Sequence, residues 1–439
     1  MRVDDASIRA KLERQQEAIA QHNPVINALI CPPGHEQLQA RVQTLVKRPQ
    51  GLLHGLTVSL KDNIDTNFAP TTAGARFWKQ RQPVQNAVVV NRLLQAGAIA
   101  MGKASMTELA WGVSGYSALG GQCRHPLDHR RIAGGSSGGS AASVAAGFCD
   151  ASLGTDTGGS VRIPAAFCGL LGLRPTFGGI SNHGVLPLSH SHDTVGILAQ
   201  EVVDVARLYT AIAGPCAQDP TSNGQPASNV LARLHQGVEG LRLGIPTHYY
   251  FDYCAPEVCE AVMAGATLLA QQGATLVNVQ VTGAEQAQEM AMCMMASEVT
   301  GRYANRLNTA PESISTSIRE RMLQAFSYTG LDYAQAMQFK QRWQWQLRQQ
   351  FSDIDVMLMP TTTCTAPRIG KHKNLLEATR DVARNTYLSA MAGIPSLSVP
   401  CGTDAHGLPI GMMLESAWGR EDLLLRVANV LMTVLPSHL

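Results

Sequence analysis

The sequence predicts an α/β fold in one large domain, with helices on both faces of a central sheet. Three observations support this prediction. Hydrophobic residues make up 45% of the 439 residues and charged residues only 15%, which supplies a large core and excludes general disorder. Segments expected to be strands and helices alternate along most of the chain, and the strands are nearly continuous apolar runs, as in sheets covered on both faces. No internal repeat or low-complexity linker divides the chain.

The N-terminal elements follow from apolar spacing. Ile8, Leu12 and Ile19 recur at roughly helical spacing among charged neighbours, so an amphipathic helix is expected over residues 5–22. The next strand, helix and strand are expected over 55–61, about 86–96 and 98–102. The first of these strands ends at a lysine, Lys61.

The second half of the chain continues this alternation after a loop around 215–230, where Pro, Gln, Ser and Asn accumulate. Short apolar runs are expected as strands over 241–245, 274–281, 356–359, 396–399 and 410–414. Longer segments are expected as helices over 256–272, 284–306, 332–351 and 421–434. We expect the region 215–350 to shape a pocket within a single domain that spans 1–439.

The charge balance and the cysteines limit the function classes. With 35 Lys and Arg against 33 Asp and Glu, the net charge is +2, so neither nucleic acid nor an anionic membrane is expected as a partner. The N-terminus is charged, and no apolar run approaches the roughly 20 residues of a membrane helix. Ten irregularly spaced cysteines suit buried thiols in a reducing compartment. A soluble, cytoplasmic protein is expected.

Glycine and serine are concentrated in two loops. The first contains Gly-Gly-Ser-Ser-Gly-Gly-Ser over 134–140, and the second contains Gly-Thr-Asp-Thr-Gly-Gly-Ser-Val-Arg-Ile-Pro over 154–164. Such loops allow backbone N–H groups to converge on a ligand without interference from side chains. A flexible linker would lack the apolar residues found among them, such as Val144 and Phe167.

Lys61, Ser136 and Ser160 form a candidate catalytic set. A serine hydroxyl is a poor nucleophile until a base removes its proton. A lysine can be that base if burial lowers its pKa from about 10.4 to near 7. Lys61 taken alone would more simply be an ordinary lysine at a strand end.

These residues and the two loops together resemble the amidase signature family of serine amidohydrolases. The similarity covers most of the chain, is densest over 51–196, and recurs weakly over 392–400 and 407–411. The resemblance implies a single large α/β domain with a mixed central sheet covered by helices on both faces. It also places the catalytic signature core in 51–196.

The resemblance implies a role for each motif residue. Ser160 would be the nucleophile, Ser136 a bridging proton shuttle beside a non-proline cis peptide, and Lys61 the general base. The oxyanion hole would be formed by the backbone N–H groups of Thr157, Gly158, Gly159 and Ser160.

Four neighbouring residues are expected to support the loops. Asp156 and Arg162 match the motif and are expected to hold the second loop by charge-assisted hydrogen bonds. Ser137 and Ser140 are expected to bond local backbone rather than to react. Arg174 stands where many family members have lysine, a departure that affects no catalytic residue.

The implied reaction is hydrolysis of a carbon–nitrogen bond through an acyl-enzyme, without metal or cofactor. The substrate would be a small amide, with an aryl amide expected from the similarity to the indoleacetamide and mandelamide hydrolases, or a carbamate (urethane). The protein would be a monomer or homodimer. The alternative is the A subunit of a tRNA-dependent amidotransferase, a glutaminase in a multi-protein complex. Activity of the single chain would distinguish the two.

Other motifs leave alternatives open. Gly134–Gly138 also fits the G-x-S-x-G nucleophile elbow, which requires a strand directly before the serine. Cys123, His125 and His129 form a weak candidate metal cluster, for which a polar loop is the better interpretation.

Two further features lie outside the family motifs. His190 and His192, before Asp193, suggest a His–Asp pair, for which substrate contact is the better interpretation than catalysis. The methionine-rich stretch 290–295 is expected to be helix core and, as a second interpretation, to line an adaptable apolar pocket.

Overall fold

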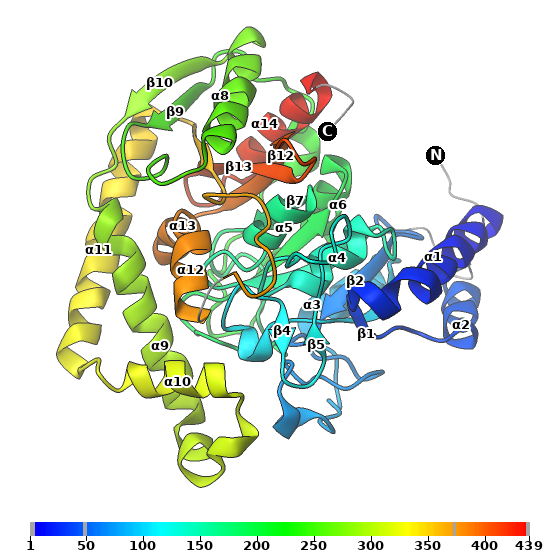
Figure 1. Cartoon of the computed structure of the whole chain (residues 1–439). Helices are drawn as coiled ribbons and strands as arrows, with labels where there is room; N and C mark the ends of the chain where they lie inside the picture. Colours follow the sequence, from blue (N-terminus) through cyan, green and yellow to red (C-terminus); the bar gives the residue numbers. More distant parts are fainter. Residues whose placement is uncertain (1–4, 47–50, 372–374, 436–439) are drawn as a thin grey trace.

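An 11-stranded sheet runs through the centre of the computed structural model, which describes residues 5–46, 51–371 and 375–435 (Figure 1). The strands of this sheet are β1 (Leu29–Cys31), β2 (Thr57–Lys61), β3 (Ile99–Ala104), β6 (Ala151–Asp156), β7 (Leu171–Arg174), β8 (Thr194–Ala199), β9 (Arg242–Pro246), β10 (Thr275–Val279), β11 (Val356–Pro360), β12 (Ser396–Thr403) and β13 (Pro409–Ser416). Their order across the sheet is β1-β3-β2-β6-β8-β7-β12-β13-β11-β9-β10. A separate hairpin joins β4 (Tyr116–Ser117) and β5 (Gly121–Gln122).

The sheet is mixed, as expected. Strands β3, β2 and β6 are parallel, and so are β11, β9 and β10. The strands between these two groups pair antiparallel from β6 through β8, β7, β12 and β13 to β11. Because β6 and β8 are antiparallel, Asp156 at the end of β6 lies opposite Thr194 at the start of β8. This register places the segment before β8 beside the loop after β6.

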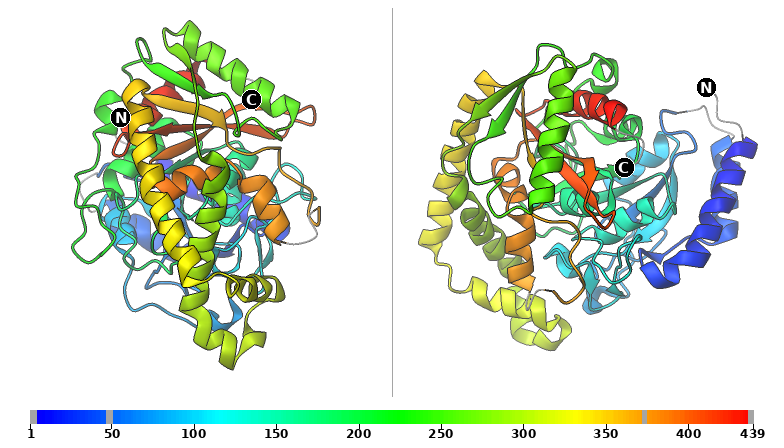
Figure 2. Two further views of the ribbon diagram at one scale, coloured as in Figure 1. Left: turned by 90° about the vertical axis from the view of Figure 1, so that its left-hand side faces the viewer. Right: turned by 45° about the horizontal axis from the view of Figure 1, so that its top comes forward.

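Helices cover both faces, so the predicted α/β architecture is confirmed. The helices are α1 (Asp5–Ile26), α2 (His35–Val46), α3 (Val88–Gln95), α4 (Gly138–Ala145), α5 (Arg162–Cys168), α6 (Val202–Ile212), α7 (Val230–Arg233), α8 (Pro256–Gln271), α9 (Ala284–Thr309), α10 (Thr316–Ala325), α11 (Gly330–Asp353), α12 (Leu375–Ala383), α13 (Thr386–Ala392) and α14 (Glu421–Val434). Helices α3, α6, α8 and α14 share one apolar cluster with the sheet. On the opposite face, α9, α11 and α13 pack together, with α9 and α11 side by side as long helices (Figure 2).

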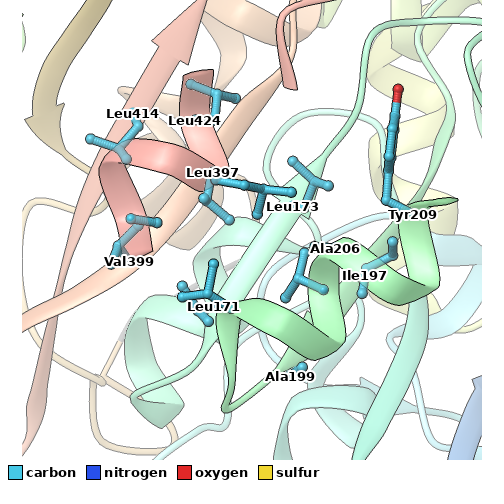
Figure 3. Packing of buried hydrophobic residues seen from close by; sticks show 14 of the residues in the cluster. Leu171, Leu173, Ile197, Ala199, Ala206, Tyr209, Leu397, Val399, Leu414 and Leu424 are labelled. Carbon is cyan, nitrogen blue, oxygen red and sulfur yellow. The ribbon is translucent and has the colours of Figure 1, made fainter. Parts of the chain in front are cut away.

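Alternating strand residues fill the first of these clusters. Figure 3 shows Leu171 and Leu173 of β7 beside Leu397 of β12, with Ile197 of β8 facing Ala206 of α6. All five side chains are buried, and none carries a polar atom that would need a partner. This dry layer fixes β7 and β8 in the middle of the sheet.

The expected elements outside the glycine-rich region are confirmed, with shifts of a few residues at their ends. The elements between 138 and 199 were not expected individually, because glycine and serine have low propensity for both helix and strand. Close packing explains them. A Cβ on Gly139 in α4 would lie 2.4 Å from the main-chain oxygens of Ala28 and Ser105, so only glycine permits this approach.

Among the described residues, no helix is both long and apolar enough to cross a membrane. All ten cysteines fall within the described ranges and have free thiols. Five of them are buried, as expected, whereas Cys31 is exposed and the other four are partly exposed.

Candidate active site

Lys61 is fully buried at the carboxyl end of β2. Its Nζ lies 2.8 Å from Ser136 Oγ, 2.8 Å from Thr155 Oγ1 and 3.2 Å from the main-chain oxygen of Thr155. Asn63 donates to the same Thr155 hydroxyl at 3.1 Å. The amine is therefore held between one oxygen of the first glycine–serine loop and two oxygens at the end of β6.

The surroundings of Lys61 favour the neutral amine. Burial lowers the pKa of Lys61 to about 7, although the negative charges of Asp193 and Asp156 act in the opposite direction. A neutral amine has two N–H bonds and one lone pair. If the neutral amine directs both N–H bonds to the two Thr155 oxygens, its lone pair is left to accept a hydrogen bond from the Ser136 hydroxyl.

The two loops meet at the serines. The Gly135–Ser136 peptide bond is cis, and the N–H of Ser137 donates to the main-chain oxygen of Ser160 at 3.1 Å. Ser136 is 0% exposed, whereas Ser160 is 9% exposed. Ser160 is thus the more exposed of the two serines. As expected, Ser137 Oγ bonds local backbone, donating to Thr155 O at 3.2 Å.

A buried charge cluster shapes the second loop. Asp156 accepts from Arg162 Nε at 3.0 Å and Nη2 at 2.9 Å, and from Arg174 Nη1 at 3.1 Å. Its two oxygens also accept the N–H groups of Gly159 and Val161. Burial would raise the pKa of Asp156, but the two guanidinium groups outweigh burial and hold this pKa well below its usual range. Asp156 is therefore an anion that fixes the loop carrying Ser160.

The four N–H groups expected for the oxyanion hole are not equivalent. That of Gly159 donates to Asp156 Oδ1 at 2.8 Å and is already used. Within the described ranges, the N–H groups of Thr157, Gly158 and Ser160 have no hydrogen-bond acceptor in the protein. Three donors rather than four are thus free for a ligand.

A pocket of about 240 Å³ is lined by apolar and polar residues that include Trp111, Met292, Met295, Arg321 and Tyr387. The Tyr387 ring touches the second loop, since a Cβ on Gly158 would lie 2.5 Å from its Cε1. Met292 and Met295 belong to the methionine-rich stretch, which contributes to the helix core and also lines this pocket.

Arg321 of α10 places a positive charge in this pocket. Its side chain is 6% exposed, its Nη1 donates to the main-chain oxygen of Trp111 at 3.1 Å, and its guanidinium lies 4.4 Å from the centroid of the Trp111 ring. Burial lowers the pKa of Arg321 to about 10, which still leaves it protonated at neutral pH. Within the described part of the chain, no acidic side chain neutralises it.

The alternative motifs do not form their expected sites. Residues 133–137 form a loop without a strand directly before Ser136, so the nucleophile-elbow interpretation is wrong. Both ring nitrogens of His125 are hydrogen-bonded to backbone groups, and the described residues contain no group of three potential metal ligands. His192 bonds Ser189 and Ser191, whereas Asp193 bonds Thr157, so they form no His–Asp pair.

Sequence reasoning missed Thr155, Asp193, Arg321 and Tyr387 as neighbours of the site. Thr155 and Asp193 lay within or next to noted motifs, but only their contacts show which side chains they reach. Arg321 and Tyr387 stand far along the chain in segments without a motif. A lone arginine on an otherwise ordinary helix carries no signal in a single sequence.

The fold is that of hydrolases that act on carbon–nitrogen bonds, and the comparison with protein families agrees. The family model described as Amidase matches residues 10–425, so the chain belongs to the amidase signature family.

Named relatives include subunits of larger enzymes. The A subunit of glutamyl-tRNA(Gln) amidotransferase from Synechococcus sp. is 33% identical, with 98% of this chain and 94% of the relative covered. The corresponding subunit structure from Thermotoga maritima has a TM-score of 0.87 at 27% identity, covering 99% of this chain and 93% of that one.

Another structure with a similar fold is described as a vestigial protein complex that reveals the origins of an s-triazine catabolic enzyme. Its chain has a TM-score of 0.92 at 32% identity, and 97% of this chain and 95% of that chain are covered. These relatives do not support the expected similarity to arylacetamide hydrolases.

Proposed function

We propose that this protein hydrolyses the carbon–nitrogen bond of a small amide through an acyl-enzyme on Ser160. One observation carries the proposal. The fully buried amine of Lys61 lies 2.8 Å from the Ser136 hydroxyl. The loop that contains Ser136 is hydrogen-bonded to the main chain of the more exposed Ser160. A base, a bridging hydroxyl and a reachable hydroxyl are what serine-dependent acyl transfer needs.

In the proposed reaction, Lys61 takes the proton of Ser136 as Ser136 takes that of Ser160. The Ser160 oxygen forms a bond to the substrate carbonyl carbon. When the carbon–nitrogen bond breaks, the proton returns through Ser136 to the departing nitrogen. Water then attacks the acyl-enzyme, gives its proton to the same relay and releases the acid.

The free N–H groups of Thr157, Gly158 and Ser160 are proposed to bind the oxygen that becomes negative in the tetrahedral intermediate. Each such donor typically contributes about 3 kcal/mol to transition-state stabilisation. The Asp156–Arg162 ion pair supports them by fixing the loop before the substrate arrives. No metal or cofactor is assigned a role in this mechanism.

We propose further that the substrate carries a negative charge in addition to the amide. The Arg321 guanidinium lies in the pocket whose lining residue Tyr387 touches the second loop, and it has no acidic partner among the described residues. A substrate carboxylate would supply one. The pocket-shaping role of region 215–350 is proposed on the same basis, because α9 and α10 contribute much of the pocket lining. Uncharged aryl amides and carbamates would leave the charge unpaired.

The second candidate is a glutaminase that works within a tRNA-dependent amidotransferase complex. The identity to A subunits over nearly the whole chain supports this candidate. Glutamine combines a side-chain amide with a carboxylate, so it fits the substrate class proposed from Arg321. In this case companion subunits would be partners in addition to the small substrate.

A matched substrate panel tests both proposals. The purified chain is assayed with two groups of substrates. Succinamate and glutamine carry a carboxylate, whereas butyramide, phenylacetamide and a carbamate do not. We expect kcat/KM for succinamate to exceed that for butyramide by about 10- to 100-fold, since a charge-assisted hydrogen bond contributes roughly 1.5–3 kcal/mol. Arg321→Met should remove this preference, whereas Arg319→Met on the same helix should keep it.

Ser160→Ala serves as the reference for the reaction itself and should abolish turnover of every substrate. Normal rates in this variant would reject the nucleophile. Preferred turnover of uncharged aryl amides would reject the charged substrate but keep the acyl-enzyme. Turnover of glutamine only after addition of the companion subunits of an amidotransferase would favour the complex over a free-standing amidase.

A further inference from the structure

Asp193 connects the segment before β8 to the second glycine–serine loop. Its Oδ1 accepts from Thr157 Oγ1 at 2.6 Å, and its Oδ2 accepts the N–H groups of Leu188 at 2.8 Å and Ser189 at 3.0 Å. The side chain is 6% exposed. These three bonds hold the carboxylate against the Thr157 side chain. The N–H of Thr157 is one of the three free donors of the loop.

A second carboxylate holds this segment from the other side. Glu298 of α9 accepts from Ser189 Oγ and Ser191 Oγ, both at 2.6 Å, and from Tyr333 OH at 2.9 Å. The segment that positions Asp193 is therefore fixed by a long helix that also lines the pocket. A series of hydrogen bonds therefore connects α9, through residues 188–193, to Thr157.

Asp193 also acts on the site through its charge. Burial raises the pKa of Asp193 to about 6, while the bonds from Thr157 and the two N–H groups oppose this rise, so the group is an anion at neutral pH. Among the charges that act on Lys61, that of Asp193 has the largest effect in favour of the protonated amine. The ionisable groups around this pair are Asp156 on β6, Arg174 on β7, Glu298 and Tyr303 on α9, Lys340 on α11, and the adjacent His192.

We propose that Asp193 is a positioning residue of the reaction, which holds the oxyanion loop through Thr157 and places a negative charge beside the end of β6, where Thr155 holds Lys61. This inference rests on the proposed roles of Lys61 and Ser160. It assigns two separable effects to one carboxylate. The bond to Thr157 governs how fast the serine reacts, and the charge governs at which pH it begins to react.

The test measures Ser160 modification directly, so it needs no knowledge of the natural substrate. Phenylmethylsulfonyl fluoride reacts with an activated serine: an oxygen–sulfur bond forms, fluoride leaves, and the serine proton passes to the base. Mass spectrometry gives the rate of labelling between pH 5 and pH 9. In the unmodified protein, the rate should rise with pH to a plateau with a midpoint near 7, where Lys61 loses its proton.

Asp193→Asn should change both features of this profile. The plateau rate should fall by about 10-fold or more, because the asparagine cannot accept all three hydrogen bonds. The midpoint should move at least about half a pH unit lower, because Lys61 loses a negative neighbour that favours its proton. A purely structural role would lower the rate without moving the midpoint.

Asp404→Asn is a matched control. Asp404 likewise accepts one threonine hydroxyl, that of Thr365, and two N–H groups, those of His406 and Leu408, but it closes the turn between β12 and β13. This variant should keep the plateau and the midpoint of the unmodified protein. A shift of equal size in Asp404→Asn would overturn the inference.

Substitutions of Thr157 separate the two effects. Thr157→Val removes the hydroxyl and should lower the plateau without moving the midpoint, because the charge of Asp193 remains. Thr157→Ser should label faster than Thr157→Val, because it can still donate to Asp193. These variants also test the role of Asp193 if Asp193→Asn does not fold. Equal labelling rates in Thr157→Val and Thr157→Ser would overturn the inference.

Failure of the proposed function gives a different result. If Ser160 is not labelled in the unmodified protein, or if Lys61→Met keeps the same pH dependence, the nucleophile and base are wrong. If Ser160 is labelled with the expected dependence and a folded Asp193→Asn has an unchanged profile, only the role of Asp193 is wrong.

Discussion

Two lysines at the ends of neighbouring strands show how surroundings decide the role of a residue. Lys61 and Lys103 are both fully buried, on β2 and β3. Burial lowers the pKa of Lys103 to about 8, and a nearby carboxylate, that of Asp62 at 3.8 Å, acts against this effect. Lys103 donates to Thr71 Oγ1 and to a main-chain oxygen. Lys61 instead contacts the hydroxyl of Ser136, so Lys61 is the one of the two that we propose as the base.

The pH dependence of turnover should report the proton of Lys61. Since the base must be neutral and burial lowers its pKa to about 7, kcat/KM should fall about tenfold per pH unit below pH 7 and level off above it. Initial rates between pH 5 and pH 9 check this expectation. Lys11→Met, which removes an ion pair of the N-terminal helix, should keep the same acid limb. A constant rate down to pH 5 would contradict the neutral lysine.

Among the elements, the close contact of α5 with β7 determines where Ser160 lies. Helix α5 begins at Arg162, two residues after Ser160. A Cβ on Gly172 of β7 would lie only 2.4 Å from the Ala165 Cβ of α5 and 3.0 Å from the main-chain oxygen of Val161. Any side chain at Gly172 would therefore push α5 away from the sheet, and the loop that precedes it would move as well.

We expect Gly172→Ala to lower the free energy of unfolding by about 1–3 kcal/mol, the usual cost of overpacking a close contact. Urea denaturation measures this change. Gly301→Ala is the matched control, because Gly301 lies inside α9 with nothing within 4 Å of its added Cβ. The control should raise the free energy of unfolding by roughly 0.4–1 kcal/mol, since alanine favours helix over glycine. An unchanged free energy of unfolding in Gly172→Ala would show that α5 can move away from β7 without loss of stability.

Over the whole molecule, the catalytic loops and the pocket come from distant parts of the chain. The first loop precedes α4 and the second lies between β6 and α5, both in the N-terminal half, whereas Arg321 and Tyr387 approach from the C-terminal half. The central sheet joins the two halves through the pairing of β7 with β12. A single continuous sheet thus holds the reacting groups and the pocket in a fixed relation.

Hydrogen exchange should reveal an uneven stability across this sheet. Strand β8 is buried along its whole length and pairs with β6 and β7, whereas β10 lies at the edge of the described sheet, beside β9, and has exposed residues. We expect the amides of β8 to exchange only upon global unfolding and those of β10 to exchange through smaller, local openings. Mass spectrometry of peptides from both strands checks this, with β6 as an internal reference. Equal protection of β10 and β8 would contradict it.

The sequence by itself determined the architecture and the two loops. Apolar runs such as 356–359 and helical spacing such as that of Ile8 and Leu12 report burial and periodicity, which are local properties of a chain. The loops around Ser136 and Ser160 were also visible, because their glycines are consecutive. Local patterns of this kind survive in any single sequence.

Only the tertiary structure decided which groups face one another. The antiparallel register of β6 and β8 brings Asp193 to Thr157, and the folding of α9 and α10 over the loops brings Arg321 to the pocket. Such contacts join residues far apart in the chain, and their energy depends on distance and burial in space. No spacing within the sequence encodes either quantity, so the charges that surround Lys61 could be identified only once the chain was folded.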